Sequence, residues 1–209
     1  MDTTRRWLWI RALAVLTLAA DAVFTLVCGA AQFWRSDLDP LVMPLSAYLT
    51  GPGGDYVRLA YYAMAAGLLS LAIAGFLATP ARNRSVLAAI LFGVAAVALP
   101  PVAVTALFGH TSHESLARGL HNIAAQTTFL CLCFAMPLLS MRWRRDPRLG
   151  RGITGVALAW AAFTWLWVYV TYHGLPSGSM QKILIVLILA WLGWAAWQLL
   201  RAQDFNSRP

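Results

Sequence analysis

Residues 86–108, VLAAILFGVAAVALPPVAVTALF, contain no charged side chain and decide the fold class of this chain. The hydrocarbon core of a bilayer is about 30 Å thick, and a helix needs about 20 apolar residues to cross it. A stretch of this length and composition therefore predicts a membrane-spanning helix. Pro100 and Pro101 lie inside it and remove two backbone donors, so we expect a bend there.

The rest of the chain has the same apolar character. Of its 209 residues, 60% are hydrophobic and only 11% are charged, whereas a soluble domain is about 25% charged. This composition excludes a water-soluble globular fold and leaves no room for a separate catalytic domain. The net charge of +8 comes from basic residues that flank apolar stretches, which indicates contact with lipid headgroups and not with nucleic acid.

Five more apolar stretches flank residues 86–108. Together the six predict an all-α polytopic membrane protein, a six-transmembrane-helix bundle that forms a single membrane domain over residues 1–209. Arginines precede the first stretch, as in a signal peptide, but its apolar part is longer than a signal core, and we expect it to stay uncleaved. The expected helices cover residues 9–32, 58–78, 86–108, 120–139, 153–172 and 183–200.

Basic residues are distributed unequally between the two ends of these helices. With the N-terminus inside, twelve of them lie on the inner side and four on the outer side. Positive residues favour the cytoplasmic side, so we expect a multi-pass protein of the inner (plasma) membrane with both termini cytoplasmic. The inner group is Arg5, Arg6, Arg11, Arg82, Arg84, Arg142, Arg144, Arg145, Arg148, Arg151, Arg201 and Arg208, and the outer group is Arg35, Arg58, Arg118 and Lys182.

Polar side chains, including all four histidines, gather on the predicted outer side. Asn122 and Gln126 are one helical turn apart and share a face. We interpret this gathering as an outward-facing polar pocket that binds a lipid or small molecule; alternatively, polar residues simply collect where helices meet water. The candidate ligand-binding residues are Asp21, Asn122, Gln126, Tyr169, His173 and Gln181.

Asp21 lies near the middle of the first expected helix. A central acidic residue costs at least about 2.5 kcal/mol on insertion scales, so it normally faces the protein interior. One interpretation is the proton or cation site of a small proton-coupled transporter. The other is a structural hydrogen bond, for which the expected partners are Ser70, Thr105, Gln126 and Thr164.

Catalytic and metal chemistry have weaker support in the sequence. Ser46, His121 and Asp39 are the candidates for a membrane-embedded hydrolase or transferase at the outer leaflet, but no catalytic motif surrounds them. His110, His113 and His121 offer metal ligands without a regular metal spacing. We therefore expect no metal and no cofactor. The expected partners are membrane lipids, with a second copy or another membrane protein as alternatives.

Several short motifs in the same order resemble one family of proteins. They are Asp39-Pro40, Pro44-Leu45-Ser46-Ala47-Tyr48, Gly51-Pro52-Gly53, Gly119-Leu120-His121-Asn122, His173-Gly174-Leu175 and Gln181-Lys182. The pattern resembles the DUF998 family of six-helix prokaryotic membrane proteins, which is distantly similar to Frag1/DRAM-type proteins. The resemblance implies a fold and a topology but no substrate, and it directs attention to Ser46, Gly119, His121, Asn122 and Gln181.

Overall fold

A computed structural model describes residues 3–109, 111–149, 153–172 and 174–206 and confirms the all-α class. Its six long helices are each long and apolar enough to span a membrane, and the described residues contain no strand. The helices are α1 (Thr3–Trp34), α2 (Gly54–Ala78), α3 (Val86–Thr105), α4 (Glu114–Trp143), α5 (Thr154–Thr171) and α6 (Ser177–Asn206), with short 3-10 helices at Leu45–Leu49, Ala81–Asn83 and Ala106–Phe108.

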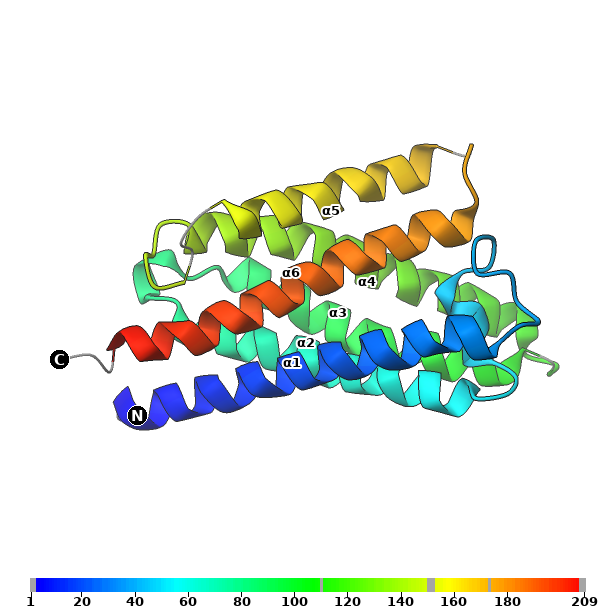
Figure 1. Ribbon diagram of the computed structural model, residues 1–209, viewed down its shortest axis with the longest axis horizontal. Coiled ribbons are helices and arrows are strands. Elements are labelled where there is room, and N and C mark those ends of the chain that lie inside the picture. The colour runs from blue at the N-terminus through cyan, green and yellow to red at the C-terminus, as the bar shows by residue number, and fades with distance from the viewer. Residues whose placement is uncertain (1–2, 110, 150–152, 173, 207–209) are drawn as a thin grey trace.

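The helices run up and down, so that both termini lie at the same end of the bundle (Figure 1). We call this the termini end and the opposite one the distal end. Helices α1 to α4 pack in chain order, and α6 returns to lie against α1. Helix α5 runs along one edge and packs chiefly on α4 and α6 (Figure 1). The core therefore lies mainly among α1, α2, α3, α4 and α6, and Ala159, Ala162 and Leu166 of α5 pack against it.

Most of the helices extend beyond the apolar stretches that predicted them. Helix α4 begins at Glu114 and not at residue 120, and α6 begins at Ser177 and not at residue 183. The extra turns carry polar residues, such as the Glu114–Arg118 ion pair on one face of α4. Hydropathy marks only the part of a helix that suits lipid, so it misses turns that project into water. Helix α3 is shorter than predicted and ends at Thr105, where the 3-10 turn Ala106–Phe108 follows.

Buried tryptophans link the helices near the termini end. The indole N–H of Trp191 donates to the Ser140 hydroxyl at 2.9 Å and to the Gly155 carbonyl at 3.1 Å. The Trp143 indole donates to the Thr79 hydroxyl at 2.9 Å. A buried indole N–H needs such an acceptor, and these bonds therefore fix how α4 meets α2, α5 and α6.

Helices α1 and α2 cross closely at Gly67. The Thr17 hydroxyl donates to the carbonyls of Leu13 at 2.9 Å and of Gly67 at 3.2 Å. A Cβ atom on Gly67 would lie 2.7 Å from the Cβ of Ala20. Small residues allow this approach, because helices associate in lipid through close van der Waals packing.

We expect Gly67→Ala to lower the thermal stability of the detergent-purified protein, because the added methyl group overpacks the α1–α2 crossing by about 1–3 kcal/mol. Gly93→Ala is the matched control, since a Cβ there meets nothing within 4 Å. Alanine also forms helix better than glycine by about 1 kcal/mol, so the control is expected to keep or raise the melting temperature. An equal change in the two variants contradicts the tight crossing.

Candidate functional site

The segment that joins α1 to α2 folds over the distal end of the bundle. We call residues 35–53 the lid. Its centre is the 3-10 helix Leu45–Leu49, in which Leu45, Tyr48 and Leu49 are buried. Their apolar side chains turn inward, so the lid packs onto the bundle as part of its core.

Arg35 fixes the lid at its start. Its side chain is buried and donates two hydrogen bonds to the Asp37 carboxylate, both at 2.8 Å, and another to the Thr50 carbonyl. The hydrogen bond from Arg35 holds the pKa of Asp37 below its usual value, and the same bond raises the pKa of Arg35. Gly51 has a φ of 74°, and a Cβ there would lie 3.0 Å from the Arg35 guanidinium. Glycine therefore satisfies both the left-handed backbone and the close approach.

The other side of the lid caps the first turn of α6. The N–H groups of Gly178 and Ser179 donate to the Val42 and Leu41 carbonyls at 3.1 and 2.9 Å. The first N–H groups of a helix have no partner within it, and lid carbonyls supply one here. A Cβ on Gly178 would lie 2.4 Å from the Met43 carbonyl oxygen, so only glycine permits this contact.

Gln181 and Lys182 extend the same contact by one turn. The Gln181 side-chain oxygen accepts the Leu45 N–H at 2.8 Å. The Lys182 ammonium donates to the Pro40 carbonyl and lies 5.4 Å from the centre of the Tyr48 ring. Burial raises the pKa of Tyr48. The buried Tyr48 hydroxyl makes no hydrogen bond to another described residue.

A cavity of about 70 Å³ lies beneath the lid. Side chains from α1, α2, α3, α4 and α6 form mainly apolar walls, including Phe24, Met64 and Leu68. Polar side chains from four segments also line it: Ser46 from the lid, Tyr61 from α2, His121 and Thr128 from α4, and Gln181 from α6. The Thr128 hydroxyl donates to the Ala124 carbonyl of its own helix.

His121 is held in one orientation by the end of α3. Its Nδ1 atom lies 3.1 Å from the Val102 carbonyl oxygen and 3.2 Å from the Thr105 hydroxyl. Because a carbonyl only accepts, Nδ1 carries a proton, and in the neutral form of the ring Nε2 is then an acceptor. The Ser46 hydroxyl and the Gln181 side-chain NH₂ make no hydrogen bond to other described residues. The cavity can therefore offer an acceptor, a hydroxyl and an amide donor.

Three of the predicted ligand-binding residues lie elsewhere. Asn122 and Gln126 are exposed on α4, and Tyr169 is half-buried on α5. They do not line the cavity. The sequence predicts how far along its helix each of these residues lies, but not how the helix is rotated about its axis. That rotation depends on how the helix packs against its neighbours. His173, which was also predicted, lies outside the described residues.

Asp21 also lies away from the cavity, between α1 and α6. Its Oδ1 atom is buried without a hydrogen-bond partner among the described atoms, and a Cβ on Gly193 would lie 3.1 Å from Oδ2. Within the described structure, no hydrogen bond joins Asp21 to any of the four expected partners: the hydroxyls of Ser70 and Thr105 donate to carbonyls of their own helices, and Gln126 and Thr164 are exposed. Gly193 thus leaves room for the carboxyl group without bonding it.

The catalytic and metal candidates are not assembled into a cluster. Asp39 accepts the Leu41 N–H at 2.8 Å in the lid and is exposed. His113 is exposed at the start of α4, next to a separate apolar groove between α3 and α4. His110 lies outside the described residues. Within the described ranges, no group of three or more His, Cys, Asp or Glu side chains is placed to hold a metal ion.

Sequence reasoning missed the residues that position the site. Val102 and Thr105 hold His121, and Gly178 admits the lid. The stretch Gly174-Leu175-Pro176-Ser177-Gly178 is typical of a turn and does not predict a contact with the lid. No sequence signal connects Thr105 with His121, because their contact depends on how α3 and α4 pack.

A model of the family described as "Protein of unknown function (DUF998)" matches residues 18–198. No curated protein matches the chain, and no solved structure does. The matched range contains the whole lid, the cavity and the start of α6. Motifs that are far apart in the sequence meet here, since Pro40 and Leu45 contact Lys182 and Gln181, while Ser46 and His121 line one cavity.

We expect Gln181→Met to loosen the lid, because it leaves the Leu45 N–H without an acceptor. Such a loss costs about 1–3 kcal/mol, so amide hydrogen exchange over residues 40–50 is expected to accelerate by at least about fivefold. Gln126→Met is the matched control, since this side chain is exposed on α4. Unchanged exchange in the Gln181 variant, or equal acceleration in both, contradicts the lid–α6 contact.

Proposed function

Because this chain belongs to the DUF998 family, whose function is unknown, we propose its role from the cavity itself. The protein binds a small, uncharged, amphipathic molecule, such as a hydroxyl-bearing lipid, beneath the lid. The observation that carries this proposal is the meeting of Ser46, His121 and Gln181, from three separate segments, at one cavity with mainly apolar walls.

The lining limits the chemistry of the ligand. No Asp, Glu, Lys or Arg is among the described lining residues, and a charge buried without a partner is costly. The polar groups instead fit a hydroxyl or carbonyl group, which exchanges hydrogen bonds with His121 Nε2, Ser46 and Gln181. Small-molecule sites combine apolar walls and a few polar groups in this way.

The size of the cavity supports a small occupant. Pockets for drug-sized ligands are about 300–1,000 Å³, whereas this cavity measures about 70 Å³. It therefore suits a small molecule or the polar end of a longer lipid. In the orientation favoured by the arginine distribution, with both termini cytoplasmic, the lid faces outward and the ligand comes from the outer side.

Binding is better supported than catalysis. A nucleophilic Ser46 needs a base within hydrogen-bond reach, and no hydrogen bond joins it to His121 in the described part of the chain. Asp39, the third candidate, is bonded to the lid backbone. A transporter that uses Asp21 has less support, since Asp21 does not line the cavity.

A monoacylglycerol that carries a diazirine on the part of its acyl chain next to the glycerol headgroup tests the proposal in the reconstituted protein. We expect light-induced labelling of peptides that line the cavity, and competition by unlabelled monoacylglycerol. Ala125 lines the cavity, so Ala125→Phe should fill it and reduce this labelling at least about fivefold, because a filled site excludes the ligand.

The matched control is Ala190→Phe, which adds the same bulk at an exposed position of α6. It is expected to label like the unmodified protein. Equal labelling in both variants, or labelling confined to lipid-facing surfaces, contradicts binding in the cavity. A matching fatty-acid probe is expected to label less, because its carboxylate finds no basic partner there.

A further inference from the structure

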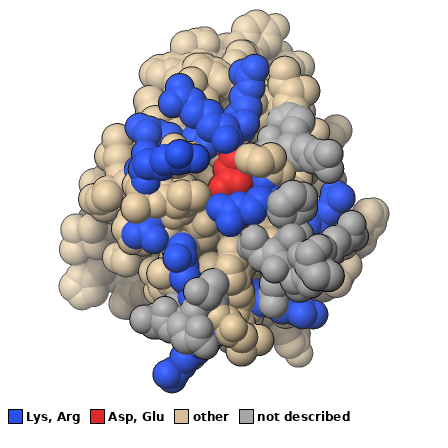
Figure 2. Space-filling model, turned by 90° about the vertical axis from the view of Figure 1, so that its left-hand side faces the viewer, with Lys and Arg blue, Asp and Glu red and all other residues tan. Residues whose placement is uncertain are grey.

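The termini end carries a dense cluster of arginines that the cavity does not involve. Figure 2 shows this end, where Lys and Arg atoms surround one small acidic area. Helices α1, α4 and α6 and the two loops that join α2 to α3 and α4 to α5 supply them. The described members are Arg5, Arg6, Arg11, Arg82, Arg84, Arg142, Arg144, Arg145, Arg148 and Arg201.

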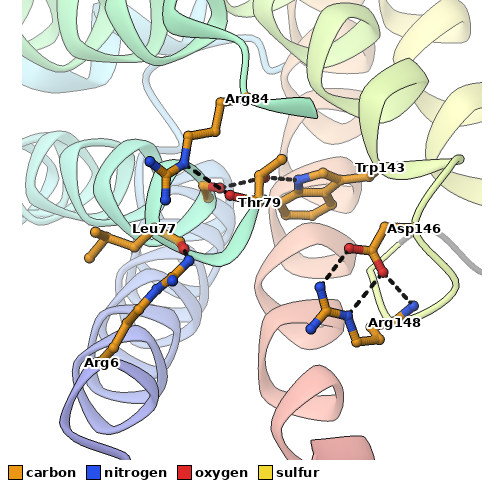
Figure 3. Close-up of polar contacts among 8 residues, drawn as sticks. Arg6, Leu77, Thr79, Arg84, Trp143, Asp146 and Arg148 are labelled. Carbon is orange, nitrogen blue, oxygen red and sulfur yellow. Dashed lines mark hydrogen bonds and ion pairs between the residues drawn. The ribbon is translucent and has the colours of Figure 1, made fainter. Parts of the chain in front are cut away.

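Two of these arginines are held in place by contacts to the end of α2 (Figure 3). Arg6 of α1 donates to the Leu77 carbonyl. Arg84 donates from Nε to the Thr79 carbonyl at 3.0 Å and lies 4.9 Å above the Phe76 ring. Each contact uses only part of a guanidinium, which has five N–H donors.

The one acidic side chain described at this end does not neutralise them. Asp146 is buried and accepts hydrogen bonds from both the side chain and the N–H of Arg148. Burial alone raises the pKa of Asp146, but the hydrogen bonds and charge of Arg148 outweigh it and lower the pKa. Asp146 is therefore ionised at neutral pH, and its carboxylate forms an ion pair with Arg148.

Arg6 and Arg84 remain without a counter-ion among the described side chains. The charges of Arg84 and Arg148 both repel Arg6, and Arg6 Nε is buried without a hydrogen-bond partner in the described structure. Positive groups held close together in this way are stabilised by an anion that bridges them. Guanidinium groups bind phosphate in a bidentate geometry, and fixed ones lose little entropy on binding.

The surroundings favour a phosphate that belongs to a lipid. Leu8 and Trp9 of α1, and Val86 and Leu87 of α3, are large apolar side chains with 54–59% of their surface exposed. They lie two and three residues after Arg6 and Arg84, in the helices α1 and α3 that are apolar enough to span a membrane. An acyl chain can lie against them while its headgroup reaches the arginines.

We propose that Arg6 and Arg84 form a binding site for the phosphate headgroup of an anionic phospholipid at the termini end. The site is independent of the cavity and of the function proposed for it. It differs from a general attraction of basic residues to the membrane, because the headgroup binds the two fixed guanidinium groups of Arg6 and Arg84 and not the other arginines of the cluster.

Lipid titration of the full-length protein in neutral detergent tests the site. Bound palmitoyl-oleoyl phosphatidylglycerol and phosphatidylcholine are counted by native mass spectrometry. We expect the phosphatidylglycerol to bind at least about tenfold more tightly. The double variant Arg6→Gln/Arg84→Gln is expected to lose most of this preference.

The matched control is Arg5→Gln/Arg11→Gln, which removes the same charge from two exposed positions of α1 and is expected to change the preference less than about twofold. Equal losses in the two double variants, or no preference in the unmodified protein, overturn the proposal. Soluble glycerol phosphate and inorganic phosphate are added in separate titrations. Displacement of the lipid by either at millimolar concentration overturns the assignment to a lipid.

The variant Arg6→Lys/Arg84→Lys guards against loss of the fold, because it keeps both charges and a donor at each position. An ammonium group cannot bind phosphate in the bidentate manner of a guanidinium. We therefore expect a several-fold loss of the preference with an unchanged melting temperature in the absence of lipid. Full retention of the preference in this variant contradicts a site built from guanidinium groups.

Discussion

Every backbone N–H and C=O that enters lipid must find its partner within the protein, and this constraint shapes the whole chain. Six helices satisfy it along their lengths. Where the chain is not helical, each backbone N–H and C=O that is shielded from water needs an individual partner. The lid meets it through specific contacts: Thr50 and Leu49 carbonyls accept from Arg35 and Arg58, and lid carbonyls accept from the start of α6.

The same requirement links the lid to the cavity. Gln181 caps the Leu45 N–H with its oxygen and lines the cavity as well. Ser46 follows Leu45 and is half-buried at the same cavity. A ligand that bonds to the Gln181 NH₂ would therefore act on the residue that holds the lid down. Binding of such a ligand would be coupled to the stability of the lid, because one side chain would serve both.

The arginines at the two ends of the bundle have different partners. At the distal end, arginines are bonded to lid carbonyls and to nearby carboxylates such as Asp37 and Asp55. At the termini end, most arginines have no described acidic partner. This difference was visible in the sequence as an excess of basic residues on one side. The structure adds which arginines are fixed, since Arg6 and Arg84 are tied to the end of α2.

Hydropathy alone predicted the class and number of helices, because the apolar stretches are long and nearly free of charge. The short motifs also directed attention to Ser46, His121 and Gln181, which line one cavity. Sequence could not show that Asn122 and Gln126 face away from it, because helix rotation depends on packing between α3 and α4. Nor could it show that Asp21 lies beside Gly193, since that contact joins residues at opposite ends of the chain.

We propose that the lid and its cavity face the outer side of the membrane, the orientation that the distribution of arginines favours. Labelling by a membrane-impermeant maleimide in intact cells tests it directly, in a background that lacks Cys28, Cys131 and Cys133. Ser46→Cys is expected to be labelled from outside, whereas Arg84→Cys should react only after the cells are broken. Labelling of Arg84→Cys in intact cells, with Ser46→Cys protected until lysis, would contradict the account.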